Sequence, residues 1–470
     1  MPKQDTARLT FYGATETVTG SKFLLSHGED THVLVDCGLF QGYKDLRLRN
    51  WQPLPIDARN IDAVLLTHAH IDHSGYLPRL VREGFSGPVF CTPGTAELAC
   101  LLLPDAAKLE EEDAAHANRR GFSKHSPALP LFTRAEASRA LRLLRPVSYG
   151  QRGQIHHDMH FTFRDAGHIL GSSSVEVEVV SKGGGTRRVL FSGDLGRYGE
   201  PIMRDPSPIP AADYVVLEST YGDREHPPED AKTALAQIIN DAAGRGGRVL
   251  IPAFAVGRAQ SVLFLLRQLE EEGRIPALPV YLDSPMAQSA TRIYEQYQSS
   301  LDEEVAATVR RGDDPFRTEH LTYITTMRQS QKLAASIYPS IVISASGMAT
   351  GGRVLHHLTR LLPDRRSSVV FVGFQAAGSR GRRLSEGEPE VKIHAQMTPV
   401  RAHIEQIEGL SAHADQGDIL RWLSGLPHAP KCVYLVHGEP SASAALQDKL
   451  RERFGWKVEV AQYGQEIELR

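Results

Sequence analysis

Cysteine is scarce in this sequence, long apolar runs are missing, and a net charge of either sign is almost absent. The four cysteines, Cys37, Cys91, Cys100 and Cys432, lie far apart and form no Cys-x-x-Cys pair, which argues against a secreted disulfide scaffold or a zinc ribbon. The N-terminal residues lack the apolar core of a signal peptide, and no stretch approaches the roughly 18 apolar residues of a membrane span. We therefore expect a cytoplasmic protein with reduced thiols and no membrane partner.

The balance of charge limits the kind of partner that the whole surface can attract. In 470 residues, 53 Lys and Arg oppose 56 Asp and Glu, which leaves a net charge of −3. Apolar residues at 41% and charged residues at 23% are ordinary globular values, so collagen-like, coiled-coil and largely disordered classes are excluded. Any binding of nucleic acid must rest on a local basic patch.

The chain does contain 20 histidines and a change of pattern near Gly222. Before Gly222, short apolar or alternating segments are separated by glycine-containing turns and read as strands. After it, apolar strands alternate with amphipathic helices, as in Arg248–Pro252 followed by Gly257–Glu272. That alternation is typical of βαβ units around a parallel sheet. The sequence therefore predicts an α/β protein of at least two domains.

The most informative stretch, His68-Ala69-His70-Ile71-Asp72-His73, follows an apolar strand predicted at Ala63–Thr67. In an extended segment, residues two apart point the same way, so His68 and His70 can hold one cation. If a helix begins next, Asp72 and His73 point toward a second position nearby. Neutral imidazole and carboxylate are suitable ligands for Zn²⁺. We predict a metal site here, with a solvated histidine-rich turn as the alternative.

Further candidates for this site follow other predicted strands. His168 lies in a glycine-rich loop, Asp194 has small neighbours on both sides, and Asp36 ends an apolar strand. Ligands gathered from successive strand ends are how a rigid scaffold builds a metal site. These residues strengthen the metal prediction over the alternative.

In chain order, these residues resemble the first four motifs of the metallo-β-lactamase superfamily. Three later stretches resemble motifs of its β-CASP branch, the nucleic-acid-processing nucleases: Glu218–Gly222, Ser411–Asp415 and Leu435–Glu439. The resemblance spans nearly the full chain. The sequence is similar to the stand-alone bacterial and archaeal β-CASP ribonucleases and to the nuclease subunit of the eukaryotic pre-mRNA cleavage complex.

This resemblance implies a fold and a domain division. The implied fold class is α/β, an αββα metallo-β-lactamase sandwich with an inserted β-CASP domain of mostly parallel sheet flanked by helices. Residues 1–222 and 390–470 would form the discontinuous first domain, and residues 223–389 the insertion.

The resemblance also implies a ligand set for two Zn²⁺ ions and a kind of substrate. A histidine in the third β-CASP motif goes with RNA-acting members, whereas DNA-acting members tend to carry valine, so His437 favours RNA. Asp36 would orient ligands rather than bind metal. One ion would be held by His68, His70 and His168, the second by Asp72, His73 and His437, with Asp194 bridging both.

The implied activity is a hydrolase, a two-zinc phosphodiesterase that cleaves RNA. A hydroxide bridging the metals would attack phosphorus and leave a 5′-phosphate and a 3′-hydroxyl. Endonuclease activity is expected, with 5′-exonuclease activity left open. Metals supply no proton for the departing ribose oxygen, so His413, oriented by Glu218, is the candidate general acid. His394 is a rival that matches no motif.

Contacts to substrate are expected in the inserted part. Ser344, Ser346 and Gly347 lie where a strand opens into a helix at a glycine-rich turn, where backbone N–H groups favour anions; tight strand–helix packing is the alternative. Three arginines are candidates for phosphate or backbone contact, against internal ion pairs or solvated faces: Arg258, Arg353 and Arg380.

Other functions stay open at this point. The same scaffold could carry a DNA nuclease, or a non-catalytic subunit of an RNA-processing complex. A hydrolase of small thioesters or lactams shares the metal motif but leaves Glu218, His413 and the large insertion unexplained. A homodimer or a complex with RNA-processing partners is open as well.

Overall fold

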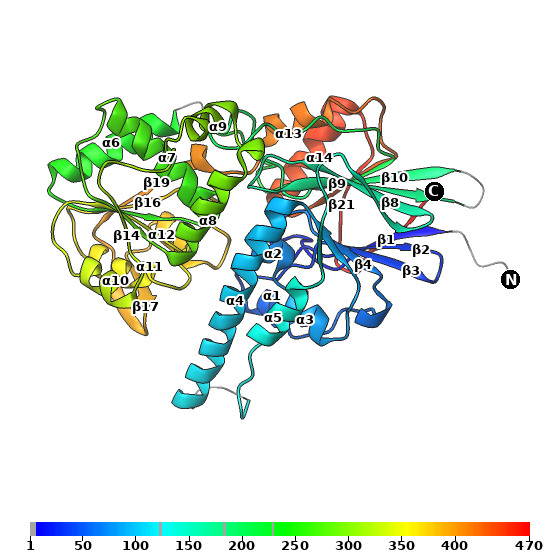
Figure 1. Ribbon diagram of the computed structural model, residues 1–470, viewed down its shortest axis with the longest axis horizontal. Helices are drawn as coiled ribbons and strands as arrows, with labels where there is room; N and C mark the ends of the chain where they lie inside the picture. The colour runs from blue at the N-terminus through cyan, green and yellow to red at the C-terminus, as the bar shows by residue number, and fades with distance from the viewer. Residues whose placement is uncertain (1–5, 122–124, 182–184, 228–229) are drawn as a thin grey trace. The chain divides into compact units, whose positions relative to one another are not determined.

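The structure is a computed structural model that describes residues 6–121, 125–181, 185–227 and 230–470. The chain divides into two units, which Figure 1 shows together. The first comprises Met1–Gly199, Asp205–Glu225 and His413–Arg470, and the second comprises Glu200–Arg204 and His226–Ala412. The second unit is thus inserted into the sequence of the first. It continues past the expected boundary at residue 389, because a late strand joins its sheet.

The first unit is built on two mixed sheets. One sheet has the order β22-β1-β2-β3-β4-β5-β6, antiparallel from β22 to β3 and parallel from β3 to β6. Its strands are β1 (Ala7–Phe11), β2 (Phe23–His27), β3 (Thr31–Val35), β4 (Ala63–Leu65), β5 (Val89–Cys91), β6 (Leu144–Pro146) and β22 (Glu466–Leu469).

The other sheet has the order β21-β20-β11-β10-β9-β8-β7. It is antiparallel from β7 to β10 and parallel from β10 to β21. Its strands are β7 (Arg152–His156), β8 (Met159–Asp165), β9 (Ser173–Val180), β10 (Thr186–Phe191), β11 (Tyr214–Glu218), β20 (Cys432–Val436) and β21 (Val458–Val460).

The two sheets face each other across one apolar core. In β8, the alternation of the sequence turns Met159, Phe161 and Phe163 inward, where they join Phe11 and Val35 of the first sheet. Helices cover both outer faces, so the expected αββα sandwich is confirmed. The helices of this unit are α1 (Lys44–Arg49), α2 (Ile71–Ser74), α3 (Leu77–Arg82), α4 (Pro93–Arg120), α5 (Arg134–Leu141), α13 (Gln416–Leu423), α14 (Pro440–Phe454) and the short η1 (Ala58–Asn60).

The second unit is built on a six-stranded sheet whose strands all run parallel, in the order β14-β13-β15-β12-β16-β19. A separate β17–β18 hairpin accompanies it. The strands are β12 (Val249–Pro252), β13 (Val280–Asp283), β14 (Leu321–Tyr323), β15 (Ile341–Ser344), β16 (Ser368–Phe371), β17 (Glu390–Ile393), β18 (Gln396–Pro399) and β19 (His403–Gln406).

Helices lie on both sides of this sheet, as expected for βαβ units (Figure 1). They are α6 (Ala231–Gly244), α7 (Arg258–Glu271), α8 (Pro285–Gln296), α9 (Glu303–Arg310), α10 (Met327–Ala334), α11 (Val354–Leu361) and α12 (Arg380–Ser385), with short helices η2 (Gln298–Ser300) and η3 (Glu408–Leu410). Among the helices of the described residues, none combines the length and the apolar character needed to cross a bilayer.

Candidate metal centre

Side chains able to bind metal meet where strands of both sheets in the first unit end. The backbone at Asp36 and His437 has positive φ angles of 58° and 51°, an uncommon conformation for residues with a Cβ that turns the chain sharply after the strand. Asp72 and His73 lie in α2, which begins just after β4. His68 and His70 follow β4, and His168 follows β8. Asp194 follows β10, and His437 follows β20.

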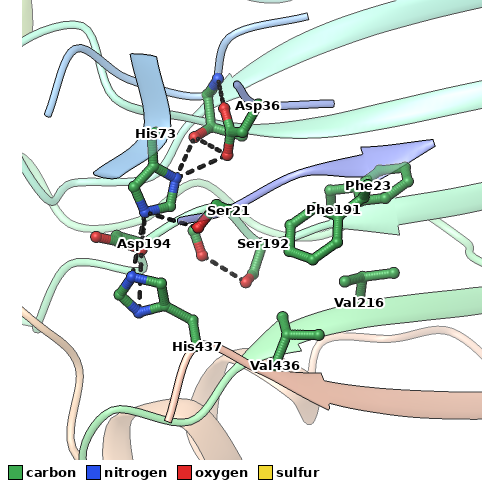
Figure 2. A pocket seen from close by; sticks show the side chains of 12 residues that line it. Ser21, Phe23, Asp36, His73, Phe191, Ser192, Asp194, Val216, Val436 and His437 are labelled. Carbon is green, nitrogen blue, oxygen red and sulfur yellow. Dashed lines mark hydrogen bonds and ion pairs between the residues drawn. The ribbon is translucent and has the colours of Figure 1, made fainter. Parts of the chain in front are cut away.

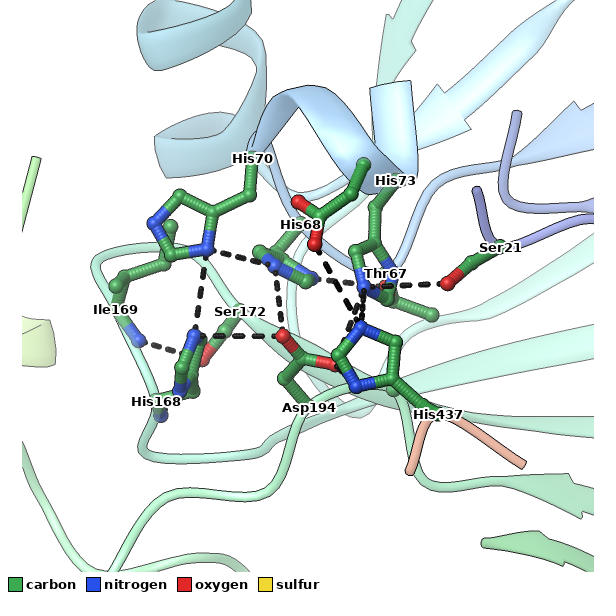
Figure 3. Close-up of polar contacts among 12 residues, drawn as sticks. Ser21, Thr67, His68, His70, His73, His168, Ile169, Ser172, Asp194 and His437 are labelled. Carbon is green, nitrogen blue, oxygen red and sulfur yellow. Dashed lines mark hydrogen bonds and ion pairs between the residues drawn. The ribbon is translucent and has the colours of Figure 1, made fainter. Parts of the chain in front are cut away.

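Four of these side chains form a first group of ligand atoms (Figure 3). Nδ1 of His70 lies 3.1 Å from Nε2 of His68 and 3.3 Å from Nε2 of His168. Oδ2 of Asp194 lies 3.4 and 3.5 Å from the same two Nε2 atoms. A tetrahedral zinc ion with bonds of about 2.0–2.1 Å has ligand–ligand edges of about 3.3–3.4 Å. The first group therefore fits a zinc ion in donor type and spacing.

A second group meets the other oxygen of Asp194. Nε2 of His73 lies 3.1 Å from Oδ1 of Asp194 and 3.2 Å from Nε2 of His437. Nε2 of His437 lies 3.6 Å from Oδ2 of Asp72. The Asp194 carboxylate thus faces one group with each oxygen (Figure 3), and the second group offers the mixed imidazole and carboxylate donors that zinc accepts.

The surroundings of His68, His70 and Asp194 favour the protonation states that bind a cation. Burial lowers the pKa of His68 well below its ordinary value and that of His70 to about 4. Burial opposes ionisation of Asp194, but the imidazoles around it, foremost His437 and His73, hold its pKa well below the usual range. Neutral imidazoles and an ionised carboxylate are the metal-binding forms. His73 differs, because the carboxylates beside it, Asp194 foremost, outweigh burial and raise its pKa.

Asp36 supports the ligands from behind. Its buried carboxylate accepts hydrogen bonds from Nδ1 of His73 at 2.7 Å and from both the backbone N–H and the hydroxyl of Thr67 at 2.8 Å. The bond to Nδ1 fixes the His73 ring with Nε2 toward the second group. This is the contact through which a carboxylate orients a metal-binding imidazole.

Glu218 and His413 form a pair beside the cluster. Nδ1 of His413 lies 3.1 Å from the Glu218 carboxylate, and the His413 ring centre lies 4.5 Å from that of His168. Glu218 is buried and is fixed by the Leu195 N–H and the Thr220 hydroxyl, each at 2.5 Å. Burial disfavours the charged imidazole, but the Glu218 carboxylate outweighs it and raises the pKa of His413 to about 9.

A small cavity lies on the inner side of the cluster (Figure 2). Its polar wall includes His73, Asp194 and His437, and its apolar wall includes Phe23 and Phe191 from the core between the sheets. The cluster therefore rests on the apolar core, which limits access of water from that side.

The three arginines expected at the substrate have partners within the second unit. Nη1 of Arg258 lies 3.8 Å from a carboxylate oxygen of Glu200, and Nη1 of Arg353 donates to Oδ1 of Asp283 at 2.9 Å. Nε of Arg380 donates to a backbone carbonyl at 3.1 Å. Glu200 is therefore a partner for the ion pair that the sequence left open for Arg258. Contact of the three arginines with substrate stays a prediction.

The turn expected to bind phosphate also has internal contacts. The buried Ser344 hydroxyl donates to the Asp283 carbonyl at 3.2 Å, and the Ser346 hydroxyl accepts from the Thr350 N–H at 3.1 Å. A Cβ on Gly347 would meet backbone and ring atoms of Phe254 at 2.8–3.0 Å, so the chain passes too close there for a side chain. A phosphate contact at this turn stays a prediction.

Three hydroxyl groups that the sequence did not single out hold the cluster. The Thr67 hydroxyl lies 3.1 Å from Nδ1 of His68, and the Thr220 hydroxyl lies 3.1 Å from Nδ1 of His437. The Ser172 hydroxyl accepts the His168 N–H at 3.0 Å. Each lies inside or beside one of the motifs described above, and that position is the sequence signal that could have identified it.

An αββα sandwich with this histidine and aspartate cluster at its strand ends defines a metal-dependent hydrolase of the metallo-β-lactamase class. Comparison with known proteins agrees. Residues 19–93 match the metallo-beta-lactamase superfamily, residues 259–384 the Beta-Casp domain, and residues 397–461 the Zn-dependent metallo-hydrolase RNA specificity domain.

Relatives that match nearly the whole of this chain are also found. Ribonuclease TTHA0252 of Thermus thermophilus is 39% identical over 461 residues, which cover 98% of this chain and 99% of the relative. Transcription termination factor FttA of Methanocaldococcus jannaschii is 31% identical over 95% of this chain and 69% of its own. A crystal structure of a protein of unknown function from Enterococcus faecalis shares the fold, with a TM-score of 0.52, 13% identity and coverage of 99% and 100%.

This protein belongs to the β-CASP family of the metallo-β-lactamase superfamily. The resemblance drawn from its motifs is confirmed.

Proposed function

We propose that this protein is a zinc-dependent ribonuclease that hydrolyses RNA phosphodiester bonds to a 5′-phosphate and a 3′-hydroxyl. The observation that carries the proposal is the Asp194 carboxylate, whose two oxygens face two separate groups of ligand atoms. Support for RNA comes from the match to an RNA specificity domain and from the relative named Ribonuclease TTHA0252.

Two zinc ions would occupy the two groups. His68, His70 and His168 would hold one, and Asp72, His73 and His437 the other, with Asp194 shared. When bound, the ions lower the pKa of a water nucleophile and neutralise charge that develops on the phosphoryl oxygens. The protein's own part is to keep seven donors in place, which it does through the strand ends and through Asp36.

His413 would supply the proton for the leaving group. Because Nδ1 of His413 is held by Glu218, its Nε2 is the nitrogen that can donate to the departing 3′-oxygen. Glu218 acts as a positioning residue, since its carboxylate is already fixed by Leu195 and Thr220. The oxygen of a water that has given one proton to solvent would add to phosphorus, and the bond to the 3′-oxygen would break. The proton from Nε2 would complete the 3′-hydroxyl, and His413 would regain a proton from solvent.

We carry two further parts of this function as proposals. Substrate contacts in the second unit would come from the turn of Ser346 and Gly347. Separately, this protein would act on RNA in the cytoplasm. Replacing Ser346 with alanine would then raise KM for RNA and leave kcat unchanged.

The test compares RNA and DNA oligonucleotides of one sequence, with wild-type protein and Asp194→Asn. We expect wild-type protein to cleave the RNA, to leave a phosphate on the new 5′ end, and Asp194→Asn to be inactive. A 5′ label and an internal label separate release of single nucleotides from internal cuts. Equal or faster cleavage of the DNA would make a DNA nuclease the better description, and binding of RNA without cleavage would favour a non-catalytic subunit.

A further inference from the structure

A patch around α1 combines exposed aromatic rings with basic side chains, and the chemistry above uses none of them. Tyr43 precedes the helix, Lys44 and Arg47 lie in it, and Trp51 follows it. Tyr43 and Arg47 are four residues apart, and the Arg47 N–H donates to the Tyr43 carbonyl at 3.0 Å, as in a helical turn. Trp51 lies four residues after Arg47, just beyond the C-cap Asn50. We call Tyr43, Lys44, Arg47 and Trp51 the α1 patch; Figure 1 shows α1 in the first unit.

The aromatic rings of the α1 patch are unusually exposed. Tyr43 is 57% exposed and Trp51 is 47% exposed, although both residue types are usually buried over most of their surface. Helix α1 contains no buried residue, so burial of its own side chains does not explain why the helix is held in place. It is held instead by Asn50, whose side chain bonds both backbone groups of Phe40 at 2.8 and 2.9 Å.

The basic residues of the α1 patch have no acidic partner. Among the described residues, neither Lys44 nor Arg47 lies within ion-pair distance of a carboxylate. By contrast, Arg59 is paired with Asp57. Arg49, at the end of α1, lies over the ring of Tyr463 at 4.8 Å. Helix α1 also carries one acid, Asp45, so its three cations leave a local excess of positive charge in a chain with a net charge of −3.

Aromatic faces and unpaired cations together match one class of partner. Single-stranded nucleic acid stacks its bases on aromatic side chains and places its phosphates on Lys and Arg, without regard to sequence. A second copy of this chain would bring the same positive charge against the patch.

The backbone ties the α1 patch to the metal centre. The segment that leads into α1 bonds to α2 and its ligands, with Cys37 N–H donating to the His73 carbonyl at 2.7 Å and Leu39 N–H to the Ile71 carbonyl at 2.9 Å. The Gln41 N–H donates to the Thr19 hydroxyl at 3.1 Å. RNA bound at the α1 patch would therefore lie on a segment whose backbone is hydrogen-bonded to the segment that carries Asp72 and His73.

We propose that the α1 patch binds a single-stranded part of the RNA substrate, with bases stacked on Tyr43 and Trp51 and phosphates on Lys44 and Arg47. This inference rests on the proposed function, because it supplies a binding surface for the same substrate. It adds affinity without base readout, so it contributes to KM rather than to the choice of sequence.

The experiment measures RNA binding separately from cleavage. Fluorescence anisotropy follows a labelled 12-nucleotide RNA with phosphorothioate linkages that resist hydrolysis, at several salt concentrations. The variants are Tyr43→Ala/Trp51→Ala and Lys44→Gln/Arg47→Gln. The matched controls are Tyr338→Ala, which is 74% exposed, and Arg119→Gln/Arg142→Gln, two exposed arginines that have no carboxylate partner among the described residues. Thermal melting checks that each variant is folded.

We expect at least a tenfold weaker Kd for the aromatic variant, and wild-type affinity for both controls. The charge variant should lower the slope of log Kd against log salt by about 1.4, because each phosphate that is no longer neutralised removes about 0.7. Unchanged affinity and slope in both patch variants would overturn the proposal while leaving ribonuclease activity intact. A changed oligomeric state with unchanged RNA affinity would overturn it in favour of a protein partner. Tight RNA binding through the patch without any cleavage would support the patch and overturn the proposed function.

Discussion

The carboxylate of Asp36 accepts a hydrogen bond from Nδ1 of His73 at 2.7 Å, and both side chains are buried. Asp36 also accepts two hydrogen bonds from Thr67, so these three partners are all donors. In Asp36→Asn the amide group would face one of these donors, and the negative charge would be lost. We expect a 10–100-fold lower metal affinity, the usual effect of removing a carboxylate that orients a metal ligand.

Competition with a chromophoric chelator measures this affinity. Asp113→Asn, an exposed aspartate in α4, is the matched control and should bind metal like the wild type. Equal affinities of Asp36→Asn and the wild type would show that Asp36 does not support the ligands.

His413→Ala tests the proton donor. We expect cleavage to slow by roughly 10²–10⁴-fold, the usual share of general acid–base catalysis, with metal content unchanged. His394→Ala is the control, because His394 lies in the β17–β18 hairpin of the second unit and has no role in the proposal. Loss of bound zinc in His413→Ala would instead identify His413 as a ligand.

Removal of metal should destabilise the protein. The two groups hold five imidazoles and two carboxylates close together, all of them buried except the partly buried His70 and Asp72. A cation that binds only the folded state stabilises it. We expect the Tm to fall on treatment with a chelator and to recover with added Zn²⁺, as followed by scanning calorimetry. Asp194→Asn should respond less to both treatments, and an unchanged Tm in wild-type protein would contradict a structural contribution from the metal.

Lys22 gives a pH-dependent stability. It is buried, and burial lowers its pKa to about 8, against about 10.4 in an unfolded chain. Between these values the folded state binds fewer protons than the unfolded state, so stability rises as pH increases from about 8 to about 10.4. Below pH 8 the buried charge costs up to about 3 kcal/mol of folding stability. The Phe40 and Tyr76 rings, whose centres lie 4.5 and 4.9 Å from Nζ, attract the charge and offset a part of this cost.

Lys22→Met removes this titration. We expect the variant to be more stable than wild-type protein at pH 7 and to lose that advantage by pH 10, as measured by urea unfolding. A difference in stability that does not change between pH 7 and 10 would show that Lys22 titrates normally.

The cluster residues could be predicted because their chemistry follows from their place in the sequence. His68 and His70 follow an apolar strand in a pattern that fits a cation, and His168 and Asp194 follow two others. Strands packed in a sandwich bring such ends together, so the strand pattern indicated these residues, whereas His437 and the division into two ligand sets came from the family resemblance.

Other features depend on contacts that no local pattern shows. The sequence indicated Arg353 as a candidate for phosphate contact but not its partner Asp283, which ends β13, whereas Arg353 precedes α11. Strand β19 is short and mostly polar, and its membership in the second unit's sheet depends on pairing with β16. The Thr67 hydroxyl was hidden in the same way, because its partners Asp36 and His73 are distant in sequence from one another.

The central claim is that two metal ions share the Asp194 carboxylate. Anomalous diffraction from crystals of zinc-loaded protein, collected on both sides of the zinc absorption edge, tests it most directly. Two zinc peaks are expected, one among His68, His70 and His168 and one among Asp72, His73 and His437, with Asp194 contacting both. A single peak, or none at these side chains, would contradict the account.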